Sequence, residues 1–129
     1  MIRIQLKSKI HLARITDANV DYEGSIAIAE DLMQAVDLWP GEKVLVASRD
    51  TGARVETYVF AAPAGSAEIV MNGAAARLIH RGDRVTIMAF GLSEKPLRAK
   101  RVVLDELNRV IRREQGVDRT TLATEPLER

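Results

Sequence analysis

Apolar and polar residues alternate along much of the first ninety positions, a pattern typical of strands that bury one face. The opening run predicts two strand segments, over 2–6 and 10–15, broken or bulged around Lys7 and Ser8. Further apolar runs predict strands over 25–29, 43–48, 54–61, 67–71 and 84–90. Short strands that recur with little helix between them favour a barrel or sandwich of at least six strands over an alternating α/β sheet.

The polar segments between these runs predict how the strands connect. Gly52 lies in a polar loop over 49–53, so the strands on either side are expected to form a β-hairpin. Asn72-Gly73 predicts a turn that leads into one helical turn over 74–79. Residues 17–21 also predict a turn, because Asp and Asn are frequent there.

Two other segments have apolar residues at helical spacing. One short helix is expected over 29–38, with acidic residues in its first turn. Residues 102–111 fit a helix face, but 100–104 fit an edge strand equally well, and periodicity leaves both readings open. Residues 94–129 hold nine Lys and Arg, seven Asp and Glu and no aromatic residue, so this part is expected to be mostly surface, with 117–129 as a flexible tail.

Composition bounds the class of protein. The chain has 129 residues, with 19 Lys and Arg against 18 Asp and Glu, and is expected to form a single soluble domain, 1–129. A formal net charge of +1 gives no strong pull toward nucleic acid, so no nucleic-acid partner is expected. No apolar run approaches the roughly 20 residues of a membrane span, and the first residues alternate where a signal peptide would be continuously apolar. A cytoplasmic protein without a membrane partner is therefore expected.

The usual catalytic and metal-binding motifs are missing. Cysteine is absent, which excludes disulfides, thiol nucleophiles and Cys-based zinc sites. The sequence contains no P-loop, no dinucleotide-binding glycine pattern and no Gly-x-Ser-x-Gly elbow. Only two histidines occur, His11 and His80, and they lack metal-ligand spacing, so no metal is expected.

The segment Tyr22-Glu-Gly-Ser-Ile26 could carry a reaction of its own. The Ser25 hydroxyl can attack the carbonyl of Gly24 if the backbone is bent suitably, and glycine tolerates such bending. The product would be an ester in place of the peptide bond. Taken alone, however, Gly-Ser is also an ordinary turn dipeptide.

Several motifs resemble the pyruvoyl-dependent aspartate 1-decarboxylase family, and they occur in the family's order and spacing from Met1 to about Phe90. They are Met1-Ile-Arg3, Lys9-Ile-His11, Asp21-Tyr-Glu-Gly-Ser-Ile-Ala-Ile28, Arg54 with Glu56-Thr-Tyr58, Asn72-Gly-Ala-Ala-Ala76 and Gly82-Asp83. Tyr-Glu-Gly-Ser and Asn-Gly-Ala-Ala-Ala are specific jointly, although neither is so alone.

The resemblance implies a mainly β fold, a small six-stranded double-psi β-barrel with short helices, assembled as a homotetramer. It implies a proenzyme that cuts itself between Gly24 and Ser25 into a β chain, 1–24, and an α chain, 25–129. Ser25 would become a covalent pyruvoyl group that forms a Schiff base with L-aspartate, in place of pyridoxal phosphate. The products would be CO2 and β-alanine for pantothenate synthesis. An accessory maturation factor is a further partner that the resemblance allows.

The resemblance also assigns roles to individual residues. Tyr58 matches the proton donor, and Arg54 and Lys9 match cations that hold substrate carboxylates. Arg54 suits the side-chain carboxylate, which survives into the product. Self-cleavage is assigned to Gly24, Ser25, Thr57 and Asn72. Further substrate contacts are assigned to Thr57, Gly73, Ala74 and Ala75, with His11 and Tyr22 in supporting roles.

Thr57 and Tyr58 face opposite ways on a regular strand, so a bulge or a subunit boundary is needed if both serve one site. Two positions depart from the family's pattern: Ile26 stands where members often have Cys or Val, and Ala47 where some have a large aromatic residue. The departures are expected to alter pocket packing and the rate of self-cleavage.

Two alternatives stay open at this point. The first is a non-catalytic double-psi barrel that serves as a binding or assembly module. The second is a pyruvoyl decarboxylase for another acidic amino acid such as glutamate, because one methylene changes binding by only about 1–3 kcal/mol.

Overall fold

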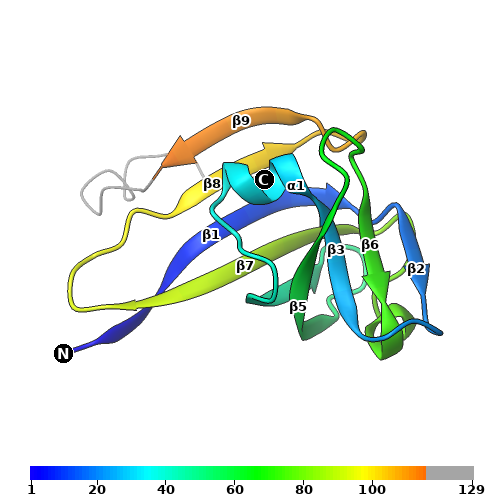
Figure 1. Cartoon of the computed structure of the whole chain (residues 1–129), viewed down its shortest axis with the longest axis horizontal. Coiled ribbons are helices and arrows are strands. Elements are labelled where there is room, and N and C mark those ends of the chain that lie inside the picture. Colours follow the sequence, from blue (N-terminus) through cyan, green and yellow to red (C-terminus); the bar gives the residue numbers. More distant parts are fainter. Residues whose placement is uncertain (116–129) are drawn as a thin grey trace.

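The structure is a computed structural model, and it describes residues 1–115. These residues form one mainly β unit (Figure 1), which confirms the predicted fold class. The strands are β1 (Arg3–Arg14), β2 (Asp17–Asn19), β3 (Ser25–Ala29), β4 (Lys43–Ser48), β5 (Arg54–Ala62), β6 (Ile69–Asn72), β7 (Arg84–Ser93), β8 (Lys100–Leu104) and β9 (Val110–Gln115). Two short helices complete the fold, α1 (Glu30–Ala35) and the 3-10 helix η1 (Gly73–Arg77). The predicted tail, 117–129, lies outside the described residues.

The strands hydrogen-bond in the order β2-β6-β3-β5-β4-β7-β1-β8-β9. Most neighbours are antiparallel, but β1 with β8, β2 with β6 and β3 with β5 are parallel. In Figure 1 the long β1 and β7 run across the molecule, while β2, β3, β5 and β6 cross them at a steep angle. The sheet therefore bends around a single core instead of lying flat.

The predicted alternation sets which face of the sheet is buried. On β4 and β7 the residues Val44, Val46, Val85 and Ile87 are at most 1% exposed, while Leu45, Ala47, Thr86 and Met88 between and after them are only partly buried. The buried set continues through Ile10, Ile26, Val59 and Met71 on β1, β3, β5 and β6. Because side chains alternate between faces, the residues between these core positions lie on the opposite, outer face.

The predicted break in the first strand is present as a bulge. β1 is continuous, but its pairing with β7 shifts between Leu6 and Ser8, and shifts again between Ile10 and Ala13. Leu12, inside the second shift, has a φ of 62°. Bulges of this kind turn a strand and redirect its side chains.

Two strand predictions were wrong in part. The expected turn over 17–21 contains β2, three residues that pair parallel with β6 before the chain turns. Nine strands form within residues 1–115, so the structure does not confirm the count of six that the resemblance implied. β8 lies between β1 and β9, so the edge-strand reading of 100–104 was wrong although the strand itself is correct.

The described part of the charged region, 94–115, is mostly exposed, as predicted, but a few of its residues are buried. Val102, Val103 and Leu104 on β8 are all buried, because β8 covers part of the core next to β1. Asn108, also buried, accepts from the Arg14 backbone N–H at 2.7 Å and donates to the carbonyls of Arg14 at 2.9 Å and Ala67 at 3.0 Å. This segment is thus part of the fold.

The predicted hairpin and helices are confirmed with small changes in length. β4 and β5 pair antiparallel, and Gly52 between them has a φ of 77°. α1 is shorter than the expected 29–38, because Asp37 takes a φ of 60° and the Leu38 N–H donates to the Met33 carbonyl at 2.9 Å. The helical turn after Asn72 is η1.

Candidate active site

Ser25 lies at the start of β3, where the chain enters the sheet. It is 8% exposed and is the Cα partner of Asn72 on β6. The Asn72 side-chain Nδ2 donates to Ser25 Oγ at 3.4 Å. A hydrogen bond of this length is weak, so it orients the hydroxyl without fixing its position. The asparagine and the serine, far apart in sequence, are thus brought together by the β3–β6 pairing.

Gly24 directly precedes this serine and is exposed. Gly24 does not have a positive φ among the described residues. The backbone bend expected at this glycine is therefore not a left-handed conformation. A Cβ built on Gly24 would also meet no atom within 4 Å. Gly73 has the left-handed backbone instead, with a φ of 83°.

Thr57 and Tyr58 lie on β5 beside the start of β3. β3 and β5 are parallel, and Ile26 pairs with Val59. One residue earlier on each strand, Ser25 is level with Tyr58, and two residues earlier Gly24 is level with Thr57. No bulge interrupts the pairing of β5 with β4. Thr57 and Tyr58 therefore face opposite sides of the sheet, with Tyr58 on the outer face. Tyr58 is 40% exposed, and its ring meets Phe60 edge-on with centroids 5.5 Å apart.

Lys9, His11 and Arg54 lie on the same outer face, on strands further along the sheet. Lys9 pairs with Met88, which pairs with Leu45, which pairs with Glu56. One row further on, His11 Nδ1 lies 3.0 Å from Thr86 Oγ1. Thr86 pairs with Ala47, and Ala47 pairs with Arg54. His11, which lies within the second bulge of β1, is therefore on the face that carries Lys9.

The cations and Ser25 are nevertheless separated within one chain. Arg54 lies four residues before Tyr58 on β5, which is about 13 Å of extended strand. Lys9 on β1 lies three strand spacings from β5, or about 14 Å of sheet width. One chain thus presents two groups: the cleavage cluster, which consists of Gly24, Ser25, Thr57, Asn72 and Gly73, and the cationic face, which consists of Lys9, His11 and Arg54.

The remaining predicted residues surround the cleavage cluster. Ala74 and Ala75 follow Gly73 in η1. Tyr22 is exposed, and its backbone carbonyl faces Gly73. Ile26 is fully buried with Val59, so this departure from the family's pattern affects the core. Ala47 lies on the outer face between Thr86 and Arg54.

Two residues near the cationic face were missed from the sequence. Thr86 bonds His11, and strand alternation over 84–90 could have indicated its outward direction. Arg101 on β8 is the Cα partner of Lys9, but its Nη2 is bound by Glu114 Oε2. No local pattern indicates the second pairing, because it depends on β8 running parallel to β1.

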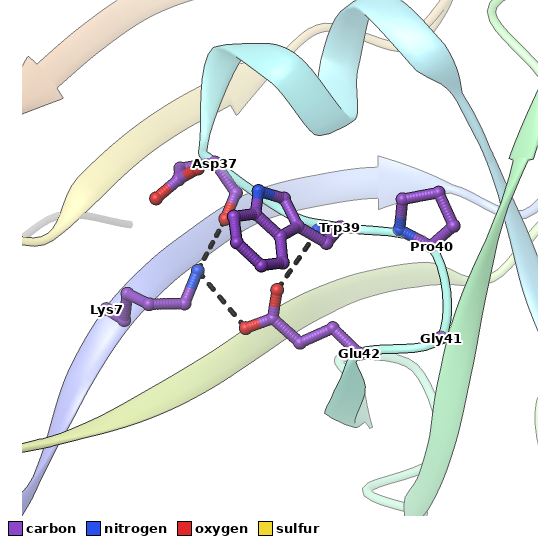
Figure 2. Close-up of a pocket in the computed structure, with 6 residues that line it drawn as sticks. All are labelled: Lys7, Asp37, Trp39, Pro40, Gly41 and Glu42. Atoms are coloured by element: carbon purple, nitrogen blue, oxygen red, sulfur yellow. Dashed lines mark hydrogen bonds and ion pairs between the residues drawn. The ribbon is translucent and has the colours of Figure 1, made fainter.

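A cavity of about 440 Å³ lies next to Lys7 and Trp39, and none of the predicted site residues lines it. Figure 2 shows the residues that do. Lys7 Nζ donates there to Glu42 Oε2 at 3.1 Å, to Ser8 Oγ at 2.9 Å and to the Asp37 carbonyl. These three acceptors use all three ammonium donors. The indole of Trp39, which is 74% exposed, lies beside the ion pair of Lys7 and Glu42. The cavity therefore offers no free cation to an acidic ligand.

Residues 1–115 show no sign of a metal centre or a membrane-spanning helix. This part of the chain holds no group of three or more His, Asp or Glu side chains arranged to bind a metal ion. None of its helices is long and apolar enough to cross a membrane. The groups with shifted pKa values lie outside the two site groups: backbone N–H groups lower the pKa of Asp50 and Asp105, and burial lowers the pKa of Arg84.

A buried serine hydroxyl held by an asparagine amide, with a separate cationic face, suits a small mainly β enzyme with an acidic substrate. A family model described as aspartate decarboxylase matches residues 1–111. The chain belongs to the aspartate decarboxylase family.

Curated relatives carry the same description. The chain is 52% identical over 111 residues to the aspartate 1-decarboxylase of Thermotoga petrophila, which covers 86% of this chain and 97% of that protein. It is 50% identical over 116 residues to the aspartate 1-decarboxylase of Dehalococcoides mccartyi, covering 87% and 94% of the two chains. Among solved structures, the computationally designed protein msDPBB_sym2 is similar with a TM-score of 0.42 and 21% identity, covering 69% of this chain and 99% of that one.

Proposed function

We propose that this protein is a cytoplasmic aspartate 1-decarboxylase that first cleaves itself between Gly24 and Ser25 and then converts L-aspartate to β-alanine and CO2 for pantothenate synthesis. The observation that carries the proposal is the Asn72 amide on the Ser25 hydroxyl, directly after Gly24, in a chain of this family. The relatives at about half identity are named for the same reaction.

Self-cleavage uses only groups of this chain. The Ser25 Oγ attacks the Gly24 carbonyl carbon, a new C–O bond forms, the C–N bond breaks, and the hydroxyl proton passes to the freed amine. Asn72 supports this step because its Nδ2 lies on the attacking oxygen. Thr57, level with Gly24, is suited to the carbonyl side. Holding a nucleophile against its target removes much of the entropic barrier.

Residue 25 then becomes the pyruvoyl group. β-Elimination releases Gly24 as a carboxylate and leaves a dehydroalanine, which water hydrolyses with loss of ammonia. The surroundings of Ser25 fit this change, because its side chain lies at a strand start beside an amide donor and makes no other hydrogen bond within residues 1–115. A pyruvoyl carbonyl there supplies an electron sink for the carbanion left when CO2 departs.

Other residues hold the substrate and move its proton. Arg54 is exposed on the outer face, and its planar fork suits a bidentate contact with the side-chain carboxylate of aspartate. Lys9 adds positive charge on the same face. Tyr58 shares the face and strand level of Ser25, so its phenol is suited to deliver a proton to the α carbon.

We further propose a homotetramer in which the cationic face of one subunit meets the cleavage cluster of another. The separation of about 13 Å along β5 supports this arrangement, because it exceeds the reach of an arginine side chain to Ser25 within one chain. The half-exposed Tyr58 and Phe60 pair on the outer face is also typical of surfaces that bind a partner. Because β5 has no bulge, Thr57 and Tyr58 face opposite sides of the sheet. A subunit boundary at the site would still allow both residues to serve it.

Intact-mass spectrometry of the purified protein tests the proposal. Two fragments, 1–24 and 25–129, with a blocked N-terminus on the larger, are expected, together with CO2 release from aspartate and a tetramer mass by light scattering. Ser25→Ala should remain an intact tetramer without activity. A wild-type chain that stays whole, even after incubation with extract that would supply a maturation factor, would refute self-cleavage. Faster turnover of glutamate would refute the substrate.

A further inference from the structure

Gly73 is in direct backbone contact with the segment that precedes the cleavage point. It is the first residue of η1, is buried and has a φ of 83°. A Cβ built on Gly73 would lie 2.6 Å from Gly24 Cα, 2.8 Å from Gly24 N and 3.3 Å from the Tyr22 carbonyl oxygen. All three are backbone atoms, so no flexible side chain could move aside. A residue with a side chain at this position would have to displace the segment 22–24.

Other glycines with a left-handed backbone do not share this contact. Gly41, Gly52, Gly65 and Gly82 have φ values between 77° and 92°, and a Cβ on any of them would meet nothing within 4 Å. Gly24 itself also has open space at its Cβ position. The residue that must be glycine for steric reasons is therefore Gly73, which follows β6, the strand paired with β3 beside the scissile bond.

Asn72 and Gly73 are consecutive, and they contact the two sides of the Gly24–Ser25 bond. The Asn72 amide lies on the Ser25 hydroxyl at 3.4 Å, and the Gly73 α carbon lies against Gly24, which bears the carbonyl that is attacked. The junction of β6 and η1 thus contacts both reacting partners. A shift of Gly24 alone would change the angle and distance of attack while Ser25 stayed paired with Asn72.

We propose that Gly73 is a positioning residue for self-cleavage: its missing side chain lets the segment 22–24 lie where the Ser25 hydroxyl can reach the Gly24 carbonyl. The proposal rests on the proposed self-cleavage. An alanine at 73 must move Gly24 from 2.6 Å to an ordinary contact of at least 3.4 Å, a displacement of about 0.8 Å. A displacement near 1 Å costs about a hundredfold in rate in well-aligned reactions.

The test compares Gly73→Ala with Gly41→Ala, which introduces the same strain at a φ of 85° without the contact. Cleavage is followed by intact-mass spectrometry over time, and folding by circular dichroism and thermal melting. We expect Gly41→Ala to cleave like wild type, and Gly73→Ala to fold but cleave about a hundredfold more slowly. Crystal structures of Ser25→Ala and Ser25→Ala/Gly73→Ala are expected to differ in the segment 22–24.

Three results would overturn the inference while the wild-type chain cleaves: wild-type cleavage by Gly73→Ala, an unmoved segment 22–24 in the double variant, or loss of folding in Gly73→Ala alone. The last would show that the fold, not the cleavage, requires glycine at 73. An intact wild-type chain is a different outcome, because it refutes the proposed function itself.

Discussion

Asn72 Nδ2 donates to Ser25 Oγ at 3.4 Å, and the same two residues are Cα partners between β6 and β3. The antiparallel register therefore delivers the amide to the hydroxyl without any loop rearrangement. Asn72 Oδ1 is buried and has no hydrogen-bond partner among the residues that the structure describes. A buried polar atom without a partner is costly, and a catalytic role is one reason for a fold to keep such an atom.

Replacing Asn72 with Ala should slow self-cleavage by about a hundredfold, because the amide that orients the attacking Ser25 hydroxyl is lost and a misplacement near 1 Å has an effect of that order. Intact-mass spectrometry over hours to days measures the rate. Thr16→Ala is a matched control, because it too removes one side-chain hydrogen bond at β6. Thr16 Oγ1 accepts from the Ile69 N–H at 2.9 Å, at the end of β6 away from Asn72. Equal rates for Asn72→Ala and wild type would show that the amide has no part in cleavage.

Arg54→Gln should separate substrate binding from maturation. Arg54 lies about 13 Å along β5 from the level of Ser25, so the variant is expected to cleave normally. Its KM for aspartate should rise about tenfold to a hundredfold, because a charge-assisted bidentate contact is lost. Steady-state CO2 release measures KM and kcat. Arg81→Gln, an exposed arginine in the turn before β7, is the control and should leave KM unchanged.

Asp105 should make folding stability depend on pH. Its carboxylate accepts from the backbone N–H groups of Arg109 and Leu107 and from the Arg109 guanidinium, each at 2.9 Å. The Arg109 backbone N–H contributes most to holding the pKa of Asp105 below its ordinary 3.8. A lowered folded-state pKa stabilises the fold above pH 3.8, and this contribution is lost as the pH falls through the folded value.

Asp105→Asn should therefore be less stable than its parent at neutral pH, and the difference should narrow as the pH falls below about 4. Urea unfolding at several pH values, in the Ser25→Ala background and at one protein concentration, measures it. Glu106→Gln, the exposed neighbour, is the control. A difference that is constant from pH 7 to acid would contradict the assigned role of the carboxylate charge.

The sequence predicts features that depend on neighbouring residues better than features that depend on strands distant in the chain. Alternation over 54–61 is local, and it correctly puts Arg54 and Tyr58 on one face and Thr57 on the other. The run 100–104 fits two periods, and only its parallel pairing with β1 makes it an interior strand. Short apolar runs carry no information about such distant partners.

The same limit applies to the cleavage cluster. Asn72-Gly73 predicts a turn into a helical segment, and η1 begins at Gly73, which has a φ of 83°. That Gly73 lies against Gly24 follows from the β3–β6 register, which joins residues 47 positions apart. The sequence therefore indicated the residues of the cluster through the family's motifs, but not that the steric demand falls on Gly73.

Tyr58→Phe should remove decarboxylation while leaving self-cleavage and folding intact. The phenylalanine ring preserves the edge-on contact with Phe60 at 5.5 Å and loses only the hydroxyl. If that hydroxyl delivers the proton to the α carbon, kcat should fall at least about a hundredfold, the usual scale for loss of a general acid. Phe60→Leu is the converse variant: it loses the ring contact, keeps the phenol and should retain most of kcat. A small kcat effect in Tyr58→Phe together with a large one in Phe60→Leu would assign the aromatic pair to packing and leave the proton donor to be sought elsewhere on the outer face.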